Sequence, residues 1–273
     1  MDTLRFLYGT VPGRALLRPL ASRPLSRACG RFLDTSLSKG LIAPFVRANG
    51  IETGDYDLTD IGCFNDFFCR PLKRGRREID RDPAALIAPC DGLLTAVQVE
   101  EDTVLPVKQS RYSLLRLLGD EDLAAEFRGG LCLVYRLCVN HYHRYCYFDS
   151  GRKGENVFLP GALHTVRPVA LADVPVFTEN CREYTVLETE RFGKAVQMEV
   201  GAMLVGKIVN DHLWPRTVTR GEEKGHFAYG GSTVIVLLQR NAALLRQDLN
   251  RLSALGDELP VRMGERVGTA RGR

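Results

Sequence analysis

A series of five short β-type segments between residues 94 and 238 constrains the fold of this chain more than any other feature. Each segment is rich in Val, Leu, Tyr or Thr, and glycines punctuate the chain around them, which is typical of short strands joined by turns. The segments are residues 94–99, 131–137, 184–188, 196–200 and 233–238. Such a series predicts a mostly antiparallel β core, because strands with short connections pair with their neighbours in opposite directions.

Two further segments have leucines at the three- and four-residue spacing of a helix that buries one face. They are residues 113–127, which Gly119 interrupts, and residues 241–252. We therefore predict helices in both places, attached to the β core.

Residues 1–55 have a different character and predict a basic amphipathic helical arm. No acidic residue lies between Asp2 and Asp34, where arginines alternate with leucines and phenylalanines, and three prolines divide this stretch into short helices. Such helices suit the surface of an anionic bilayer, with arginines at the headgroups and leucines beneath them. The same pattern also fits an arm that packs on its own protein with its arginines in water. The predicted fold class is therefore α+β, with a helical N-terminal arm followed by a mostly antiparallel β core.

The composition fits either one large domain or one domain with a smaller appendage. The chain has 273 residues, 45% of them hydrophobic and 26% charged, and its mean hydropathy is −0.12, which allows a sizeable core. Its longest apolar runs, such as residues 84–88 and 234–238, are far shorter than the roughly 20 residues of a membrane span. A net charge of +4 permits an anionic partner. We expect no nucleic-acid binding, because the arm lacks the interleaved stacking aromatics of a single-strand surface.

The eight cysteines form no Cys-x-x-Cys pair, so a zinc ribbon or a thioredoxin-type motif is not expected, and we predict no metal site. Residues 1–30 contain no continuous apolar stretch of the kind that a secretory signal has. We therefore expect reduced, mostly structural cysteines in an intracellular protein.

Ser232 is the first residue whose setting suggests chemistry. The motifs of dinucleotide, P-loop, zinc-protease and α/β-hydrolase sites are absent. Ser232 follows Gly230 and Gly231 and directly precedes an apolar run, which is the pattern of a glycine turn that enters a buried strand. Alternatively, the flexible glycines let the serine hydroxyl approach the preceding carbonyl, and the serine attacks its own chain if a base removes its proton.

Candidate helpers lie upstream of this serine. Asp91 sits in an Asp-Gly turn just before a β segment, as a purely structural turn residue also would. His141, His143 and Cys146 follow the segment that ends at residue 137, and the two histidines would share one face of an extended strand. His164 stands alone and is uninformative by itself. The pattern leaves structural and catalytic roles open for all of them.

Seven short motifs, taken in order, resemble those of the phosphatidylserine decarboxylase family over nearly the whole chain. They are Phe-x-x-Phe-Phe-x-Arg-x-Leu-Lys at 64–73, Pro-x-Asp-Gly at 89–92, Tyr-His-Arg at 142–144, Pro-Gly-x-Leu at 160–163, Asn-x-Arg at 180–182, Val-Gly-Ala-x-x-Val-Gly at 200–206, and Gly-x-Glu-x-Gly to Gly-Ser-Thr at 221–233. Each motif is weak alone, but seven in the right order are specific.

The resemblance implies a proenzyme that cuts its own chain. Ser232 would attack the carbonyl of Gly231, and elimination and hydrolysis would leave chains 1–231 and 232–273 as a heterodimer. The second chain would begin with a pyruvoyl group made from Ser232. Asp91 would orient a histidine that deprotonates the serine, in the manner of a hydrolase triad.

The implied reaction is the decarboxylation of phosphatidylserine to phosphatidylethanolamine. The pyruvoyl cofactor would form a Schiff base with the amine of phosphatidylserine. Its carbonyl system would then accept the electrons released as carbon dioxide leaves. A nearby acid would protonate the carbon before the product is released.

The sequence departs from the family pattern Asp-Tyr-His-Arg-x-His at two positions. His141 replaces the aspartate, and Cys146 replaces the second histidine, which belongs to the family's self-cleavage triad. A cysteine is a poor general base unless its pKa is lowered. We therefore expect His164 to be the base for self-cleavage and His143 to be the proton donor in decarboxylation.

The resemblance also indicates how the chain is organised. Residues 1–55 would form a membrane-docking arm and residues 56–273 the pyruvoyl decarboxylase domain, in a peripheral protein on the cytoplasmic side of the cell membrane. Its partners would be an anionic membrane surface and phosphatidylserine. Two alternatives stay open: a pyruvoyl-dependent decarboxylase of another amino-acid substrate, or a catalytically dead membrane-bound homologue in which Cys146 marks the loss.

Overall fold

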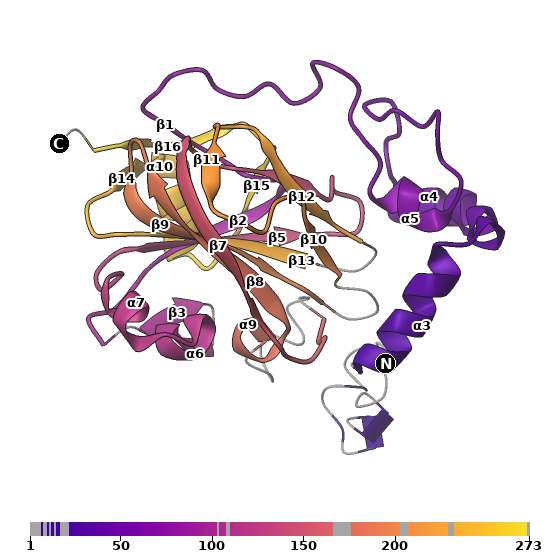
Figure 1. Cartoon of the computed structure of the whole chain (residues 1–273), viewed down its shortest axis with the longest axis horizontal. Coiled ribbons are helices and arrows are strands. Elements are labelled where there is room, and N and C mark those ends of the chain that lie inside the picture. Colours follow the sequence, from indigo (N-terminus) through magenta and orange to yellow (C-terminus); the bar gives the residue numbers. More distant parts are fainter. Residues whose placement is uncertain are drawn as a thin grey trace.

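The computed structural model describes residues 7, 10, 12–13, 15–16, 22–102, 104–107, 110–165, 176–202, 207–228 and 232–271. Its centre is an eight-stranded sheet in the order β11-β7-β8-β9-β13-β5-β2-β15, in which all neighbours are antiparallel (Figure 1). These strands are β2 (Gly92–Gln98), β5 (Leu131–Leu137), β7 (Gly151–Leu159), β8 (Arg182–Thr189), β9 (Gly193–Val200), β11 (Arg216–Val218), β13 (Ser232–Leu238) and β15 (Leu259–Val261).

Smaller sheets and helices cover both faces of the central sheet. The small sheets are β1 (Ala85–Ile87) with β16 (Arg266–Ala270) and β14 (Ala243–Leu245), β10 (Ile208–Asn210) with β12 (Glu223–Phe227) and β6 (Arg144–Cys146), and the hairpin of β3 (Val104–Val107) and β4 (Ser110–Ser113). The helices of this part are α6 (Leu114–Leu118), α7 (Glu121–Ala125), α9 (Val176–Glu179) and α10 (Gln247–Ala254). Short helices with antiparallel sheets confirm the predicted α+β class.

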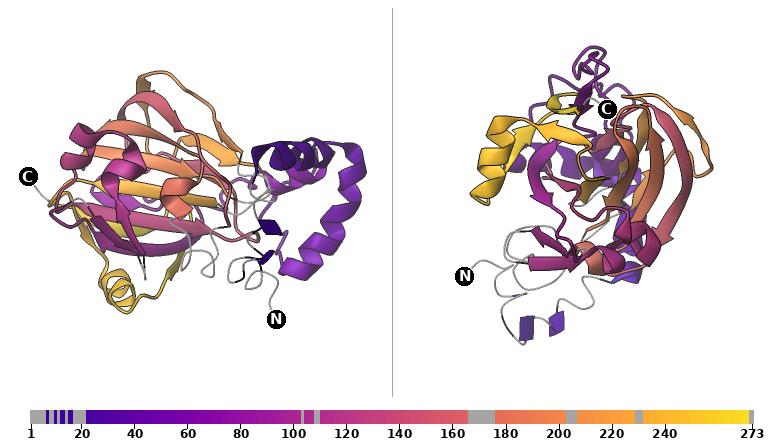
Figure 2. Two further views of the ribbon diagram at one scale, coloured as in Figure 1. Left: turned by 90° about the horizontal axis from the view of Figure 1, so that it is seen from below. Right: turned by 90° about the vertical axis from the view of Figure 1, so that its left-hand side faces the viewer.

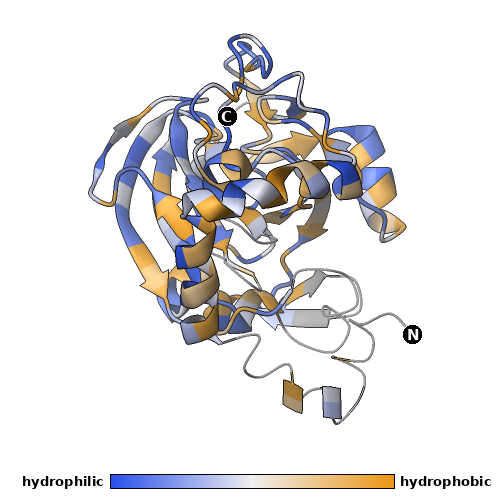
Figure 3. Cartoon of the chain, turned by 90° about the vertical axis from the view of Figure 1, so that its right-hand side faces the viewer, coloured by the Kyte–Doolittle hydropathy of each residue, from blue (hydrophilic) through white to orange (hydrophobic). Residues whose placement is uncertain are grey.

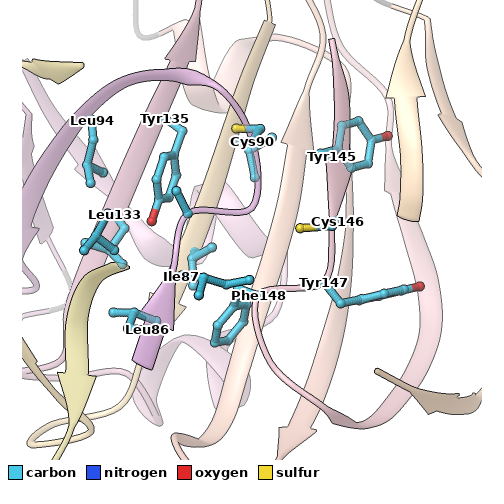
Figure 4. Packing of buried hydrophobic residues seen from close by; sticks show 14 of the residues in the cluster. Leu86, Ile87, Cys90, Leu94, Leu133, Tyr135, Tyr145, Cys146, Tyr147 and Phe148 are labelled. Atoms are coloured by element: carbon cyan, nitrogen blue, oxygen red, sulfur yellow. The ribbon is translucent and has the colours of Figure 1, made fainter. Parts of the chain in front are cut away.

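Alternate residues of β13 pack into two different hydrophobic clusters. Ile235 and Leu237 contact a cluster that includes residues of α6, α7 and α9. Val234 and Val236 contact the cluster on the opposite face, which includes residues of β1, β6 and β16 and is shown in part in Figure 4. Because side chains along a strand alternate with a period of two, Ser232 lies on the same face as Val234.

The predicted secondary structure is right for the strands and partly wrong for the helices. All five predicted β segments are strands, namely β2, β5, β8, β9 and β13. The helix predicted over residues 113–127 is divided into α6 and α7 at Gly119, which adopts a left-handed conformation with φ of 70°. The helix predicted over 241–252 is wrong in its first half, because β14 pairs there with β16, and only α10 is helical.

The arm lies beside one end of the β core (Figures 1 and 2). It contains α3 (Arg23–Leu33), the 3₁₀ helix η1 (Ser36–Leu41) and α4 (Ile42–Asn49), and α5 (Phe64–Phe68) follows it. Leu33 is buried against Phe64, Phe68 and Ala228, whereas Leu37 is 80% exposed. Hydrophobic and hydrophilic residues are interleaved along these helices (Figure 3). The arm therefore packs on its own chain and also presents apolar side chains to the outside.

In the part of the chain that the structure covers, none of the helices combines the length and apolar character needed to cross a membrane. The eight cysteines, all of which lie in that part, form no disulfide bond.

Candidate active site

One end of the central sheet brings together the segments singled out in the sequence. β2 and β13 begin at this end, and β5 and β9 finish there, because neighbouring strands are antiparallel. Ser232 of β13 pairs with Leu137 of β5. The register of β2 and β5 sets Gly92 on the other side of Leu137, so Gly92 and Ser232 lie two strand spacings, about 10 Å, apart. Asp91 immediately precedes Gly92, and it therefore lies at the same end of the sheet as the serine.

Ser232 is the first residue of β13 and is fully buried. Within the described part of the chain, its Oγ has no hydrogen-bond partner. A buried hydroxyl left without a partner costs about 1–3 kcal/mol, so its presence calls for a functional explanation. Gly231, the other residue of the expected cleavage site, lies outside the described residues.

Asp91 is held by an arginine. Arg77 donates from Nη2 to Asp91 Oδ2 at 2.7 Å and from Nε to Oδ1 at 2.9 Å, and the backbone N–H of Met263 donates to Oδ1 at 2.9 Å. The Arg77 and Asp91 side chains are only 6% and 9% exposed, so the pair is a strong, charge-assisted one. Among the described residues, no imidazole hydrogen-bonds to Asp91, although the sequence analysis expected one there.

The turn after β5 holds His141 in the field of this carboxylate. His141 Nδ1 accepts a hydrogen bond from the backbone N–H of Cys138 at 3.1 Å. Burial lowers the pKa of His141, while the charge of Asp91 raises it and those of Arg136 and Arg77 lower it. His141 is therefore a neutral imidazole at pH 7, and since Nδ1 accepts, its proton is on Nε2. The sequence pattern had left both a structural and a catalytic role open for His141.

His143 is completely buried against Phe68 of α5, and the ring centroids lie 4.1 Å apart. Its Nδ1 lies 3.0 Å from the carbonyl oxygen of His141. The expectation that His141 and His143 share one face of a strand is wrong, because a turn precedes them and β6 begins only at Arg144. The contact with Phe68 places His143 at the junction of the arm and the β core.

His164 is tied to the strand beside Ser232 through one asparagine. Asn180 accepts from the His164 backbone N–H and donates to the His164 carbonyl, both at 2.8 Å, and the same side chain donates to Gly201 O at 2.7 Å. The register of β9 and β13 places Gly201 opposite Ser232. Burial lowers the pKa of His164, an effect that the nearby Glu179 carboxylate opposes. The backbone of His164 is therefore tied to the strand beside the serine, and its imidazole Nε2 lies 3.9 Å from Glu179 Oε2.

Cys146 cannot take over the work of a histidine base. It is fully buried in β6, where its backbone N–H donates to Pro89 O at 2.8 Å. Burial raises the pKa of its thiol to about 12, so the group stays protonated at neutral pH.

Glu199 and Lys224 form a buried ion pair on the same face of the sheet as Ser232, and the sequence patterns did not predict this contact. Lys224 Nζ lies 2.5 Å from Glu199 Oε2 and donates to Asn210 Oδ1 at 2.9 Å, and both charged side chains are fully buried. Glu199 pairs with Val234, on the same face of the sheet as Ser232. The sequence hint for this ion pair was Glu199, a charged residue within the predicted β segment 196–200, but its lysine partner lies 25 residues away.

The side chains gathered at this end of the sheet indicate what kind of chemistry the site can perform. A buried serine, a fixed carboxylate and neutral histidines at one sheet end are the components of acid–base chemistry around a nucleophilic hydroxyl.

Comparison with known proteins gives the family. A family model for phosphatidylserine decarboxylase matches residues 64–269. Phosphatidylserine decarboxylase proenzyme 2 of Clostridium acetobutylicum is 38% identical over 266 residues, covering 97% of this chain and 91% of that protein. The phosphatidylserine decarboxylase proenzymes of Clostridium botulinum (strain Langeland) and Clostridium beijerinckii are 37% and 35% identical over 270 and 271 residues, covering 97% of this chain and 92% of each relative. The chain belongs to the phosphatidylserine decarboxylase family.

Proposed function

We propose that this chain is a proenzyme that cleaves itself between Gly231 and Ser232 and then decarboxylates phosphatidylserine to phosphatidylethanolamine. One observation carries the proposal: a fully buried serine hydroxyl without a partner among the described residues, directly after the Gly-Gly pair, in a family whose curated members are named proenzymes. The products would be chains 1–231 and 232–273, which stay together as a heterodimer.

The self-cleavage proceeds in balanced steps. Ser232 Oγ attacks the carbonyl carbon of Gly231 as a base takes its proton, and the peptide C–N bond breaks to leave an ester and a free amine. Loss of the Ser232 α-proton then expels the Gly231 carboxylate. One water molecule hydrolyses the resulting enamine, releases ammonia and leaves a ketone at position 232.

The environment of Ser232 fits a pyruvoyl group. The side chain is fully buried, and its oxygen makes no hydrogen bond to a described residue that loss of the hydroxyl would break. The pyruvoyl carbonyl supplies the sink for the electrons that remain when carbon dioxide leaves.

We assign the proton transfers to two histidines. His164, neutral and tied through Asn180 to the strand beside Ser232, removes the serine proton during cleavage. His143, buried against Phe68, donates the proton that replaces the carboxylate on the substrate α-carbon. Asp91, fixed by Arg77, favours the protonated form of the neighbouring His141 imidazole at this sheet end.

Intact-protein mass spectrometry and a decarboxylase assay test the proposal together. We expect the purified protein to contain two chains in place of the 30.4 kDa precursor, the shorter one with a blocked N-terminus. We also expect it to release carbon dioxide from phosphatidylserine. A single uncut chain would support the catalytically dead alternative, and cleavage without activity on phosphatidylserine would support another amino-acid substrate.

We also propose that the arm docks on an anionic membrane surface. Its helices expose Leu37, Leu41 and Phe32. Replacing Leu37 by glutamate is expected to weaken sedimentation with phosphatidylcholine–phosphatidylglycerol vesicles about tenfold, since it removes an exposed leucine that docking would bury in the membrane and adds a charge that the anionic surface repels. Leu255→Glu is the matched control, because Leu255 is 71% exposed in the turn after α10, outside the arm. Equal loss in both variants would contradict a docking role for the arm.

A further inference from the structure

A cavity of about 410 Å³ separates α3 of the arm from the catalytic end of the sheet. Arg27 and Arg31 line it from α3, and Phe158, Cys181 and Lys207 line it from the β core. The backbone N–H of Gly201 donates to Cys181 O, so Cys181 and Ser232 lie on either side of Gly201. Two strand spacings, about 10 Å, therefore separate the cavity wall from the serine.

The charge of this cavity is unbalanced. It is lined by three cations, Arg27, Arg31 and Lys207, and by one carboxylate, that of Asp34. Asp34 already accepts a hydrogen bond from Asn65 Nδ2 at 2.6 Å. In the parts of the chain that the structure describes, the three cations have no ion-pair partner. The cavity therefore offers unneutralised positive charge at the same end of the sheet as the reacting residue, with its wall about 10 Å from the serine.

A buried polar atom and an apolar wall add to this character. Ser26 of α3 lines the cavity and is only 5% exposed, and its Oγ has no hydrogen-bond partner among the described residues. Phe158, which is 52% exposed, and Leu163 supply apolar surface on the opposite side. A ligand with an anionic oxygen at one end and hydrocarbon at the other would satisfy both sides.

Two other cavities have more carboxylates in their lining. One of about 400 Å³ has four aspartates against Arg144 and Lys207, so its charge is predominantly negative. The other, of about 1130 Å³, is lined by six arginines and five carboxylates, so its positive and negative charges nearly balance.

We propose that Arg27, Arg31 and Lys207 form the binding site for the phosphodiester of the phospholipid substrate, with Ser26 as a further donor. This inference rests on the proposed function. In phosphatidylserine four bonds separate phosphorus from the amine nitrogen, so these atoms lie about 5 Å apart. The long arginine and lysine side chains span the rest of the distance between the phosphodiester and the cavity wall. A phosphodiester held by these side chains on the serine side of the cavity, about 5 Å from position 232, puts the amine at that position and points the glycerol toward Phe158 and the exposed apolar residues of the arm.

Binding to the uncut full-length chain tests the site without requiring activity. In a Ser232→Ala background, glycerophosphoserine is the probe, and isothermal titration measures its affinity. Arg31→Gln is expected to weaken its binding about tenfold, because a charge-assisted hydrogen bond to the phosphodiester is lost. Arg47→Gln is the matched control, since Arg47 carries the same charge on α4 of the arm and does not line the cavity. We expect it to bind glycerophosphoserine as the parent does.

Three outcomes would overturn the assignment: an unchanged affinity in Arg31→Gln, an equal loss in Arg47→Gln, or inorganic phosphate binding as tightly as glycerophosphoserine. The last result would mark a site for free phosphate. In self-cleaved protein made without the Ser232→Ala substitution, Arg31→Gln is expected to raise KM for a soluble short-chain phosphatidylserine about tenfold while kcat and self-cleavage stay unchanged. Failure of the parent chain to cleave would instead count against the proposed function, and the titration would still decide the phosphodiester site.

Discussion

Replacing Ser232 by alanine is expected to give a stable, uncut chain of 30.4 kDa without decarboxylase activity. The hydroxyl is the atom that attacks the Gly231 carbonyl in the proposed function, so without it neither the chain break nor the ketone can form. The fold should tolerate the change, because the Oγ makes no hydrogen bond to any described residue. Removing an unsatisfied buried hydroxyl is neutral or stabilising. Intact mass and urea unfolding measure the two parts of this expectation.

Thr233→Val is the matched control for this substitution. Thr233 is the next residue of β13, is also fully buried, and has an Oγ1 without a hydrogen-bond partner in the described part of the chain. Its side chain points to the opposite face of the sheet. We expect Thr233→Val to cleave as the parent does. Cleavage at the same bond in Ser232→Ala would exclude the serine as nucleophile, and loss of cleavage in both variants would point to a packing effect.

Replacing His164 by alanine is expected to slow self-cleavage by about 10²- to 10⁴-fold, the usual contribution of a positioned general base. The loop around it should survive, because Asn180 bonds to the backbone of His164 and not to its ring. His143→Ala is expected to cleave fully but to lose decarboxylation by a similar factor. A gel time course for cleavage and a carbon dioxide assay separate the two effects, and His212→Ala, on an exposed loop, is the control.

The outcome for His141 decides between two assignments of the base. Asp91 acts electrostatically on His141, whereas Glu179 is the carboxylate that acts on His164. Full cleavage of His164→Ala together with an uncut His141→Ala would transfer the role of base to His141.

The pH dependence follows from the direction of the shift in the pKa of His164. Burial lowers it from 6.5, so the imidazole stays neutral, and able to accept a proton, at pH values where an exposed histidine is charged. The rate of self-cleavage should therefore be constant above pH 6.5 and should fall only below it, as the pH drops through the lowered pKa. A fall that begins well above pH 6.5 would contradict a buried histidine base.

Local pattern was sufficient for the strands but not for every helix. The segments that became β2, β5 and β13 are rich in residues that favour strands, and the continuous apolar run of β13 agrees with its burial on both faces. Leucine spacing over residues 241–252 suggested a helix throughout, yet residues 243–245 pair with β16 near the C-terminus. The spacing of residues within one segment carries no information about a partner strand outside that segment.

The candidate site was likewise predictable from the sequence only in part. Motif order predicted roles for Ser232, Asp91 and His143, and the cysteine in place of the family's second histidine led to the choice of His164; these roles stay predictions. Sequence spacing did not reveal that Arg77 neutralises Asp91, since that contact depends on how the loop after α5 returns to the start of β2.

The sequence alone determined the α+β class, the main strands, the family and the serine on which the proposed chemistry depends, since these follow from local residue patterns. Only the tertiary structure decided which charges meet. The Lys224–Glu199 pair and the cationic cavity under α3 join residues from distant segments. Such contacts arise from the antiparallel register of the sheet and from the packing of the arm on its end, which no local stretch of sequence encodes by itself.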